Sequence, residues 1–152
     1  MENLHIIKGL YAVTPEEKDL FALSSQVESC IKGGARLIQY RSKILSKTEQ
    51  QIQARKIKKI CDYYKVPLII NDDIELCRIL DADGVHLGEN DDSLVKARLV
   101  LGPSKIIGVS CYNSTDRVKM AVDKGATYIA LGACFPTTTK PHAPKASLDF
   151  IA

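Results

Sequence analysis

The sequence lacks both a strong excess of charge of one sign and any long apolar segment. Its net charge is +3, and its basic residues are scattered instead of gathered in one stripe, so we expect no nucleic-acid partner. No apolar run is long enough to cross a bilayer, and the first residues, MENLHIIKGLYAVT, do not place a basic segment before a long apolar core. We therefore expect no membrane partner and no signal peptide.

Paired cysteines are absent as well. The chain has five cysteines, an odd number, and none lies in a Cys-x-x-Cys pair. This pattern argues against a disulfide framework and against a zinc site, and it favours a reduced, cytoplasmic protein. Because each cysteine has apolar neighbours, we expect all of them to be buried as small apolar side chains. They are Cys30, Cys61, Cys77, Cys111 and Cys134.

What the sequence does contain is a regular alternation of short apolar runs and amphipathic segments. The runs that predict strands are IIKGLYAVT, LIQYR, PLIIND, GVHL, IIGVSC and YIALGAC. Thr14-Pro15-Glu16-Glu17 and Ser46-Lys47-Thr48-Glu49 predict helix starts with capping boxes, and Gly33-Gly34 predicts a helix end. Continuous apolar strands are typical of a parallel sheet that is buried on both faces. The length of 152 residues and the 45% hydrophobic content indicate a single domain over residues 1–152.

Two architectures fit this alternation, an open doubly wound sheet and a closed barrel. The first strand-to-helix turn, GLYAVTPEE, lacks the Gly-x-Gly-x-x-Gly dinucleotide fingerprint. Polar residues follow nearly every predicted strand, which is typical of a barrel, whereas an open sheet gathers its site at one switch point. We therefore predict an α/β fold of the (β/α)8 TIM-barrel type. Such barrels need about 200 residues or more, so this chain supplies only about six of the eight units.

The end of the second predicted strand carries three polar residues at alternate positions, Gln39, Arg41 and Lys43. Alternate positions on a strand point to one side. Two cations this close together repel each other unless an anion lies between them, and an arginine fork with a lysine charge suits a diphosphate. The alternative is a solvated strand edge with scattered charges.

Two neighbouring strand ends carry acidic residues. Asn71 and Asp72 end a very apolar strand, and Asp91 follows the next strand. Mg²⁺ prefers oxygen ligands, usually one or two carboxylates together with waters and substrate phosphates, so Asp72 and Asp91 are candidate metal ligands. Aspartate at a strand-to-helix junction is also a common helix cap, a role that Asp73 and Asp92 would fill.

Three further features at the strand ends are weaker signals. His86 lies between apolar residues, and a hydrogen-bonded core histidine is the favoured interpretation. Ser110 has no adjacent base in the sequence, so we do not predict a nucleophile there. The turn FPTTTK offers the hydroxyls of Thr137 and Thr139 and the charge of Lys140 to a phosphate, but an ordinary threonine-rich loop is the alternative.

Together the motifs GLYAVT, QYRSK, PLIIND, ADGVHLGEND, IIGVSC and ALGACFPTTTK, in this order, resemble thiamine phosphate synthase (thiamine-phosphate pyrophosphorylase). The resemblance runs from about Gly9 to Pro144. It implies a (β/α)8 barrel and a transferase of thiamine biosynthesis. The implied reaction joins hydroxymethylpyrimidine pyrophosphate to a thiazole phosphate and gives thiamine monophosphate and pyrophosphate. Small-molecule substrates and a Mg²⁺ cofactor are implied too, since charge that builds on the departing pyrophosphate must be stabilised.

The resemblance also implies a role for each candidate residue. Gln39 would contact the pyrimidine, and Ser110 would face both the pyrimidine and the pyrophosphate. The pyrophosphate would be bound by Arg41, Lys43, Asn71 and Lys140, the thiazole phosphate by Thr137 and Thr139, and Mg²⁺ by Asp72 and Asp91. The catalytic set would then be Arg41, Lys43, Ser110 and Lys140.

The sequence departs from the family pattern in three places. Ser42 stands where the family usually has glutamic acid, and Glu89 where it usually has glutamine. The family also continues with a glycine-rich seventh strand and an eighth strand, so we expect a member truncated at its C-terminus, with open edges at strands one and six. Two alternatives stay open: a thiazole tautomerase-like relative, and a non-catalytic or impaired barrel remnant that binds a phosphorylated ligand. A homo-oligomer in which another chain completes the barrel is open as well.

Overall fold

The computed structural model describes residues 7–88, 92–135 and 144–151. These residues form a six-stranded sheet in which each strand pairs in parallel with the next, in the order β1-β2-β3-β4-β5-β6. The strands are β1 (Leu10–Val13), β2 (Ala35–Tyr40), β3 (Leu68–Asn71), β4 (Gly84–Leu87), β5 (Ile106–Tyr112) and β6 (Tyr128–Leu131). The helices are α1 (Leu20–Lys32), α2 (Lys47–Tyr64), α3 (Ile74–Leu80), α4 (Asp92–Leu101), α5 (Thr115–Asp123) and α6 (Leu148–Ile151).

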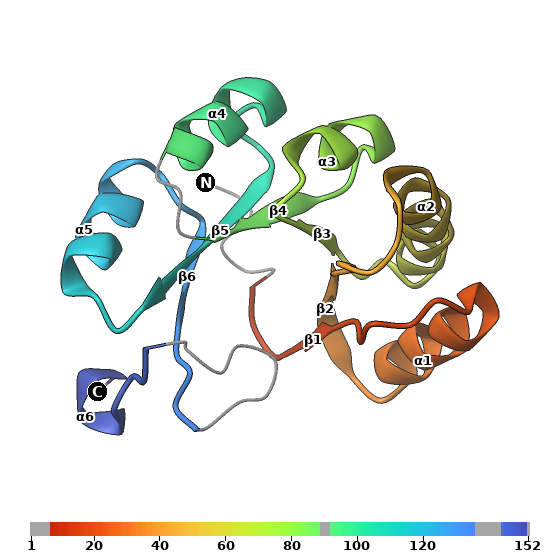
Figure 1. The fold of residues 1–152 in the computed structure, drawn as a ribbon, viewed down its shortest axis with the longest axis horizontal. Coiled ribbons are helices and arrows are strands. Elements are labelled where there is room, and N and C mark those ends of the chain that lie inside the picture. The colour runs from red at the N-terminus through yellow and green to blue at the C-terminus, as the bar shows by residue number, and fades with distance from the viewer. Residues whose placement is uncertain (1–6, 89–91, 136–143, 152) are drawn as a thin grey trace.

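The sheet is strongly curled, and helices α1 to α5 lie along its outer side (Figure 1). In the described part of the chain β1 and β6 are the two edge strands and do not pair with each other. Nevertheless, the hydroxyl oxygens of Tyr11 in β1 and Tyr128 in β6 are only 2.8 Å apart across the interior. The six strands therefore form a half-barrel of the TIM type, and the predicted fold class is confirmed.

Alternation along the strands divides the core into two layers. Residues such as Ile38, Ile70 and Ile107 pack in a large outer cluster against the helices. Leu37, Ile69 and Ile106, their neighbours in sequence, instead form a small cluster inside the curl together with Tyr11 and Tyr128. Because successive side chains of a strand point to opposite faces, the inner face of each strand leads toward the polar residues at its C-terminal end.

The structure corrects one predicted helix start. The box Thr14-Pro15-Glu16-Glu17 does not cap α1, which begins later with Asp19 as N-cap, its carboxylate accepting from the amides of Phe21 and Ala22. Thr14 is instead buried, and its hydroxyl accepts from the amide of Arg41 at 2.9 Å and donates to the carbonyl of Arg41 at 3.1 Å. Tertiary contact with the neighbouring strand end therefore outweighs the local capping pattern.

Three other predicted helix ends are confirmed, whereas the cap predicted at Asp92 stays a prediction because α4 begins at that residue. Ser46 and Glu49 form a complete capping box at the start of α2, and α1 ends at Gly33. Asp73 caps α3 and accepts from the amide of Leu76. This cap leaves the preceding residue, Asp72, outside the helix at the strand end.

The cysteines are free, as expected, but not all are buried. Cys61, Cys77 and Cys111 are fully buried, whereas Cys30 is exposed and Cys134 is half-buried. Burial raises the pKa of the Cys61 and Cys77 thiols to about 12, which makes both unreactive near neutral pH. Within the described ranges, no helix has the length and apolar character that crossing a membrane requires.

Candidate active site at the strand ends

A cavity of about 590 Å³ opens at the C-terminal ends of the strands. It is lined from β1 and its following loop, from the ends of β2 and β3, and from β4 and β5. Seven of the residues singled out from the sequence line it: Gln39, Arg41, Lys43, Asn71, Asp72, His86 and Ser110. The structure thus brings together side chains that lie up to 71 residues apart in the sequence, from Gln39 to Ser110. Their individual roles stay predictions.

Four other predicted site residues lie outside the described residues. They are Asp91, the second candidate for the metal, and Thr137, Thr139 and Lys140 of the FPTTTK turn. Asp91 comes three positions after Gly88, which itself lines the cavity.

Arg41 is held at the cavity by an acidic residue that the sequence analysis did not single out. The Nη1 of Arg41 donates to Oε1 of Glu16 at 2.7 Å, and the amide of Lys43 donates to Oε2 of the same carboxylate at 2.9 Å. The side chain of Arg41 is only 16% exposed. Glu16, in the loop after β1, therefore fixes both the guanidinium and the turn that carries the two cations. A carboxylate 25 residues from its partner leaves no local sequence signal.

Asn71 and Asp72 form a unit at the end of β3. The Nδ2 of Asn71 donates to Oδ2 of Asp72 at 2.8 Å, and the amide of Asp72 donates to the carbonyl of His86 in β4 at 2.8 Å. Asp72 has φ 61°, in the left-handed region that aspartate tolerates better than most residues. This turn separates its carboxylate from that of Asp73.

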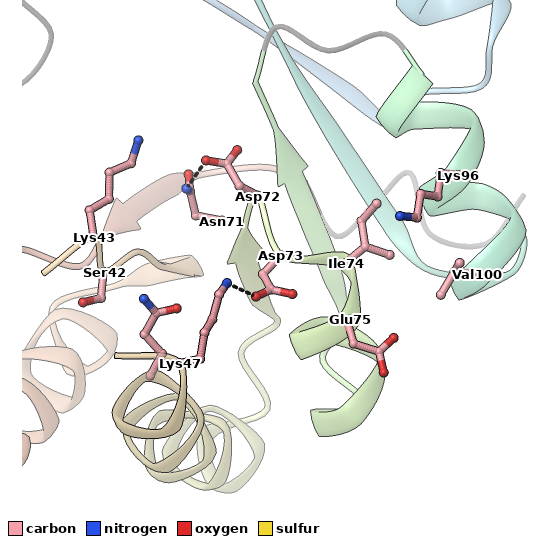
Figure 2. Close-up of a pocket in the computed structure, with 11 residues that line it drawn as sticks. Ser42, Lys43, Lys47, Asn71, Asp72, Asp73, Ile74, Glu75, Lys96 and Val100 are labelled. Carbon is pink, nitrogen blue, oxygen red and sulfur yellow. Dashed lines mark hydrogen bonds and ion pairs between the residues drawn. The ribbon is translucent and has the colours of Figure 1, made fainter. Parts of the chain in front are cut away.

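A second cavity, of about 800 Å³, adjoins the first and shares Lys43, Asn71 and Asp72 with it. Figure 2 shows that Asp73 turns to the α2 side, where its Oδ2 accepts from Nζ of Lys47 at 2.7 Å. Burial alone would raise the pKa of Asp73, but hydrogen bonds from Lys47 and from the amide of Leu76 lower it below its ordinary value. Asp73 also lines this second cavity, but its carboxylate is engaged by Lys47 and the Leu76 amide, whereas Asp72 lines both cavities.

The donor set at this edge fits a hard divalent cation shared with a ligand. Asp72 offers carboxylate oxygen, and a Cβ placed on Gly88 would lie 3.7 Å from its Oδ1. No cluster of three or more histidine, cysteine or acidic side chains that could hold a metal occurs among the described residues. Mg²⁺ typically binds one or two carboxylates and completes its shell with substrate phosphates and waters, so one described carboxylate is consistent with it.

Although no base lies next to Ser110 in the sequence, the fold places one beside it. Its Oγ lies 2.9 Å from Nε2 of His86, a residue of the neighbouring strand β4. The ring stacks on Tyr128, and its Nδ1 lies 2.9 Å from the Tyr128 hydroxyl. His86 is 9% exposed, which confirms the expectation of a hydrogen-bonded core histidine. Among the described residues, the group that meets its Nδ1 is the Tyr128 hydroxyl, whereas a carboxylate orients the base in serine hydrolases, so a nucleophilic Ser110 is still not favoured.

Two tyrosines complete the inner wall. The Nε2 of Gln39 donates to the hydroxyl of Tyr11 at 2.7 Å, and that hydroxyl meets the Tyr128 hydroxyl. Burial raises the pKa of both phenols, so both are neutral at physiological pH. Sequence patterns did not single them out, because a tyrosine in an apolar strand resembles any other core residue.

Comparison with known proteins identifies the family. A family model described as thiamine monophosphate synthase matches residues 10–152. The chain belongs to the thiamine monophosphate synthase family. The thiamine-phosphate synthase of Methylobacillus flagellatus is 49% identical over 99% of this chain and 72% of its own length. That of Azoarcus sp. is 46% identical over 95% of this chain and 70% of its own length.

Solved structures agree with this family. The thiamine phosphate pyrophosphorylase from Pyrococcus furiosus has a TM-score of 0.83 and 28% identity, over 98% of this chain and 70% of that chain. The 3-dehydroquinate dehydratase from Geobacillus kaustophilus has a TM-score of 0.60 at 11% identity, over 82% of this chain and 62% of that chain, a likeness of fold alone.

Family membership makes the chain a transferase of thiamine biosynthesis. The matches to the family run along nearly the whole chain, which spans 72% and 70% of the length of the two relatives named above. The resemblance stated from the motifs is confirmed.

Proposed function

We propose that this chain joins hydroxymethylpyrimidine pyrophosphate to a thiazole phosphate in the cavity at the strand ends. The products would be thiamine monophosphate and pyrophosphate. The observation that supports this assignment most is the convergence, on one cavity, of cations, a carboxylate and neutral polar groups from separate strands. They are Arg41, Lys43, Asp72, Asn71, Gln39 and Ser110.

The cationic side of the cavity is assigned to the diphosphate. Glu16 engages Nη1 of Arg41, and the guanidinium keeps further N–H groups that suit a forked contact to phosphate oxygens. Lys43 adds a point charge from the same turn. In this proposal Asn71 donates to the same anion, and Lys140 joins from the FPTTTK turn.

Asp72 and Asp91 are proposed to hold Mg²⁺. When bound, the cation would neutralise negative charge on the diphosphate oxygens. The carboxylate of Asp72 meets the chemical requirement for a hard-cation ligand and is oriented by Asn71 at 2.8 Å.

The bond that breaks joins the pyrimidine methylene carbon to a diphosphate oxygen, and its electron pair leaves with that oxygen. Arg41 and Lys43 stabilise the charge that develops there, which is the usual source of the largest rate gain. Gln39 and Ser110 orient the pyrimidine, so that the lone pair of the thiazole nitrogen forms the new C–N bond. Thr137 and Thr139 are assigned to the thiazole phosphate.

We also propose the cellular compartment, domain organisation and oligomeric state of the enzyme. Five free cysteines suit the reducing cytoplasm. The whole of residues 1–152 is taken as one barrel-type domain that acts on small molecules. A homo-oligomer is proposed as well, which sedimentation would measure.

The test is synthesis of thiamine monophosphate by the purified chain from both substrates and Mg²⁺. We expect Asp72→Asn to lower kcat about 100-fold, a typical effect of losing one charge-stabilising group. Asparagine also tolerates the left-handed backbone, so the variant removes charge without adding strain.

Asp73→Asn is the matched control, because it changes the adjacent carboxylate. We expect near-normal turnover and a melting temperature close to that of the wild type, because asparagine caps a helix about as well as aspartate and the variant loses only the charge that faces Lys47. Since the pKa of Asp73 is lowered in the native state, its stabilisation is present above the unfolded pKa and disappears as pH falls through the native one. Normal activity of Asp72→Asn in the presence of Mg²⁺ would refute the metal assignment. Binding of diphosphate without synthesis would favour the non-catalytic alternative.

A further inference from the structure

A continuous chain of hydrogen bonds crosses the interior of the curled sheet and joins five strands. It runs from Gln39 in β2 to Tyr11 in β1 at 2.7 Å, then to Tyr128 in β6 at 2.8 Å. From Tyr128 it continues to Nδ1 of His86 in β4 at 2.9 Å, and from Nε2 of His86 to Ser110 in β5 at 2.9 Å. Both ends of the chain, Gln39 and Ser110, line the cavity assigned to the substrates.

With the amide of Gln39 as donor to the Tyr11 oxygen, one direction of this chain gives every hydrogen an acceptor. In that direction the Tyr11 hydrogen is donated onward to the Tyr128 oxygen. The single hydrogen of Tyr128 then goes to Nδ1 of His86, which must accept it. In the reverse direction Tyr128 would also donate to Tyr11, and the Tyr11 hydrogen would have no acceptor among the contacts of the described residues.

The same count of hydrogens determines the donors and acceptors between His86 and Ser110. A neutral His86 that accepts at Nδ1 carries its hydrogen on Nε2 and donates it to Oγ of Ser110. The oxygen of Ser110 is then occupied as an acceptor, and its own hydrogen remains for a group in the cavity. Ser110 is thereby a donor toward the ligand.

Packing holds the chain in place. The rings of His86 and Tyr128 are stacked with centroids 5.7 Å apart, and Tyr11 meets Tyr128 edge-on at 5.8 Å. Gly108 in β5 leaves the space, since a Cβ there would lie 2.0 Å from Cζ of Tyr128. The phenol therefore has little freedom to choose another partner.

We propose that Tyr11, Tyr128 and His86 are positioning residues that fix the amide orientation of Gln39 and present Ser110 as a hydrogen-bond donor to the substrate. This inference rests on the proposed function, because it assumes that the cavity holds the substrates. The chemical class that such a serine recognises is an acceptor, a phosphate oxygen or a ring nitrogen with a free lone pair.

The direct test is the tautomer of His86, read from long-range ¹⁵N–¹H correlations of the histidine rings. The chain has three histidines, and His86→Asn assigns the signal. We expect the wild type to carry the hydrogen on Nε2 alone. Tyr128→Phe keeps the ring but removes the donor to Nδ1, so we expect a mixture of tautomers in that variant.

Tyr40→Phe is the matched control. The Tyr40 hydroxyl is also buried and donates to Oε1 of Gln53 at 2.9 Å, but on the helix side of the sheet. We expect both variants to lose similar stability. Only Tyr128→Phe should change the His86 signals, and only it should lower kcat, about tenfold, with KM within about twofold of wild type.

The outcomes separate the two proposals. A hydrogen on Nδ1 of wild-type His86, or a doubly protonated ring, overturns the inference. So does a Tyr128→Phe variant whose His86 signals match those of Tyr40→Phe. If the wild-type chain shows the expected tautomer but makes no thiamine monophosphate, the proposed function fails while the hydrogen-bond chain stands.

Discussion

Glu16 is the residue on which the cationic part of the site depends. One carboxylate binds the Arg41 guanidinium at 2.7 Å and the Lys43 amide at 2.9 Å. It therefore sets the direction in which the guanidinium points and holds the backbone of the turn that carries Lys43. Because both contacts lie at the rim of the cavity, we expect the effect of Glu16 to show in ligand binding.

We expect Glu16→Gln to raise the KM for the pyrimidine diphosphate about fivefold, which corresponds to about 1 kcal/mol. Glutamine is neutral and has one acceptor oxygen where glutamate has two, so it cannot replace both the contact to the Arg41 guanidinium and the contact to the Lys43 amide. Steady-state kinetics against both substrates measure this. Glu17→Gln is the control, since Glu17 accepts from the amide of Asp19 and does not line the cavity. A lower KM would show that Glu16 competes with the substrate instead of positioning Arg41.

Single residues also show what sequence alone can predict. Gln39, Asn71 and Ser110 could be found because each interrupts an apolar run at its end. Glu16 and Tyr128 could not, because their significance lies in partners 25 and 42 residues away. A local pattern carries no record of such contacts.

At the scale of the element, β5 shows how a strand serves both layers of the core. Ile107 and Val109 face the helices, whereas Ile106, Gly108 and Ser110 follow one another up the inner face. Gly108 leaves the room that the Tyr128 ring occupies. The apolar run IIGVSC predicts the strand, but it does not reveal that the ring of Tyr128 packs directly against its glycine.

We expect Gly108→Ala to destabilise the fold by about 1–3 kcal/mol, the usual cost of overpacking. The new methyl group would have to displace the Tyr128 ring, so the tautomer of His86 should change as well. Urea unfolding measures the stability. The same substitution in a Tyr128→Ala background should cost much less, because the ring is gone. Equal costs in both backgrounds would show that the ring is not the obstacle.

The starts of α1 and α2 show when local sequence decides where a helix begins and when a tertiary contact does. Ser46 and Glu49 form the box that their spacing predicts, since both partners lie within one turn. Thr14 has the same pattern but binds Arg41 on the adjacent strand end, and α1 begins at Leu20. Parallel pairing of β1 with β2 brings that competitor within reach.

At the scale of the whole molecule, the curl of the sheet makes the site. Alternation of strands and helices predicted a barrel, and the half-barrel follows from it. Its edges are β1 and β6, and Leu10 and Val13 of β1 are 60% and 52% exposed. The identity of the family required the order of motifs, because no single turn is specific.

A ligand that binds across several strands should stabilise the whole fold. We expect diphosphate with Mg²⁺, at about 100 times its Kd, to add about 2.7 kcal/mol. Scanning calorimetry should therefore show a melting temperature higher by several degrees. Chelator should remove most of this shift, and Asp72→Asn should lack the part that depends on Mg²⁺. An equal shift with sulfate at matched ionic strength would indicate screening alone.

The contact between Tyr11 and Tyr128 has one more consequence. The two phenols come from the two edge strands of the sheet, β1 and β6. Their 2.8 Å contact sets the inner width of the half-barrel at this level. This width is therefore set by a side-chain contact between β1 and β6, two strands that do not pair with each other in the part of the chain that the structure describes. Different segments could therefore be grafted beside β1 and β6 without changing the width of the half-barrel at the level of the two tyrosines.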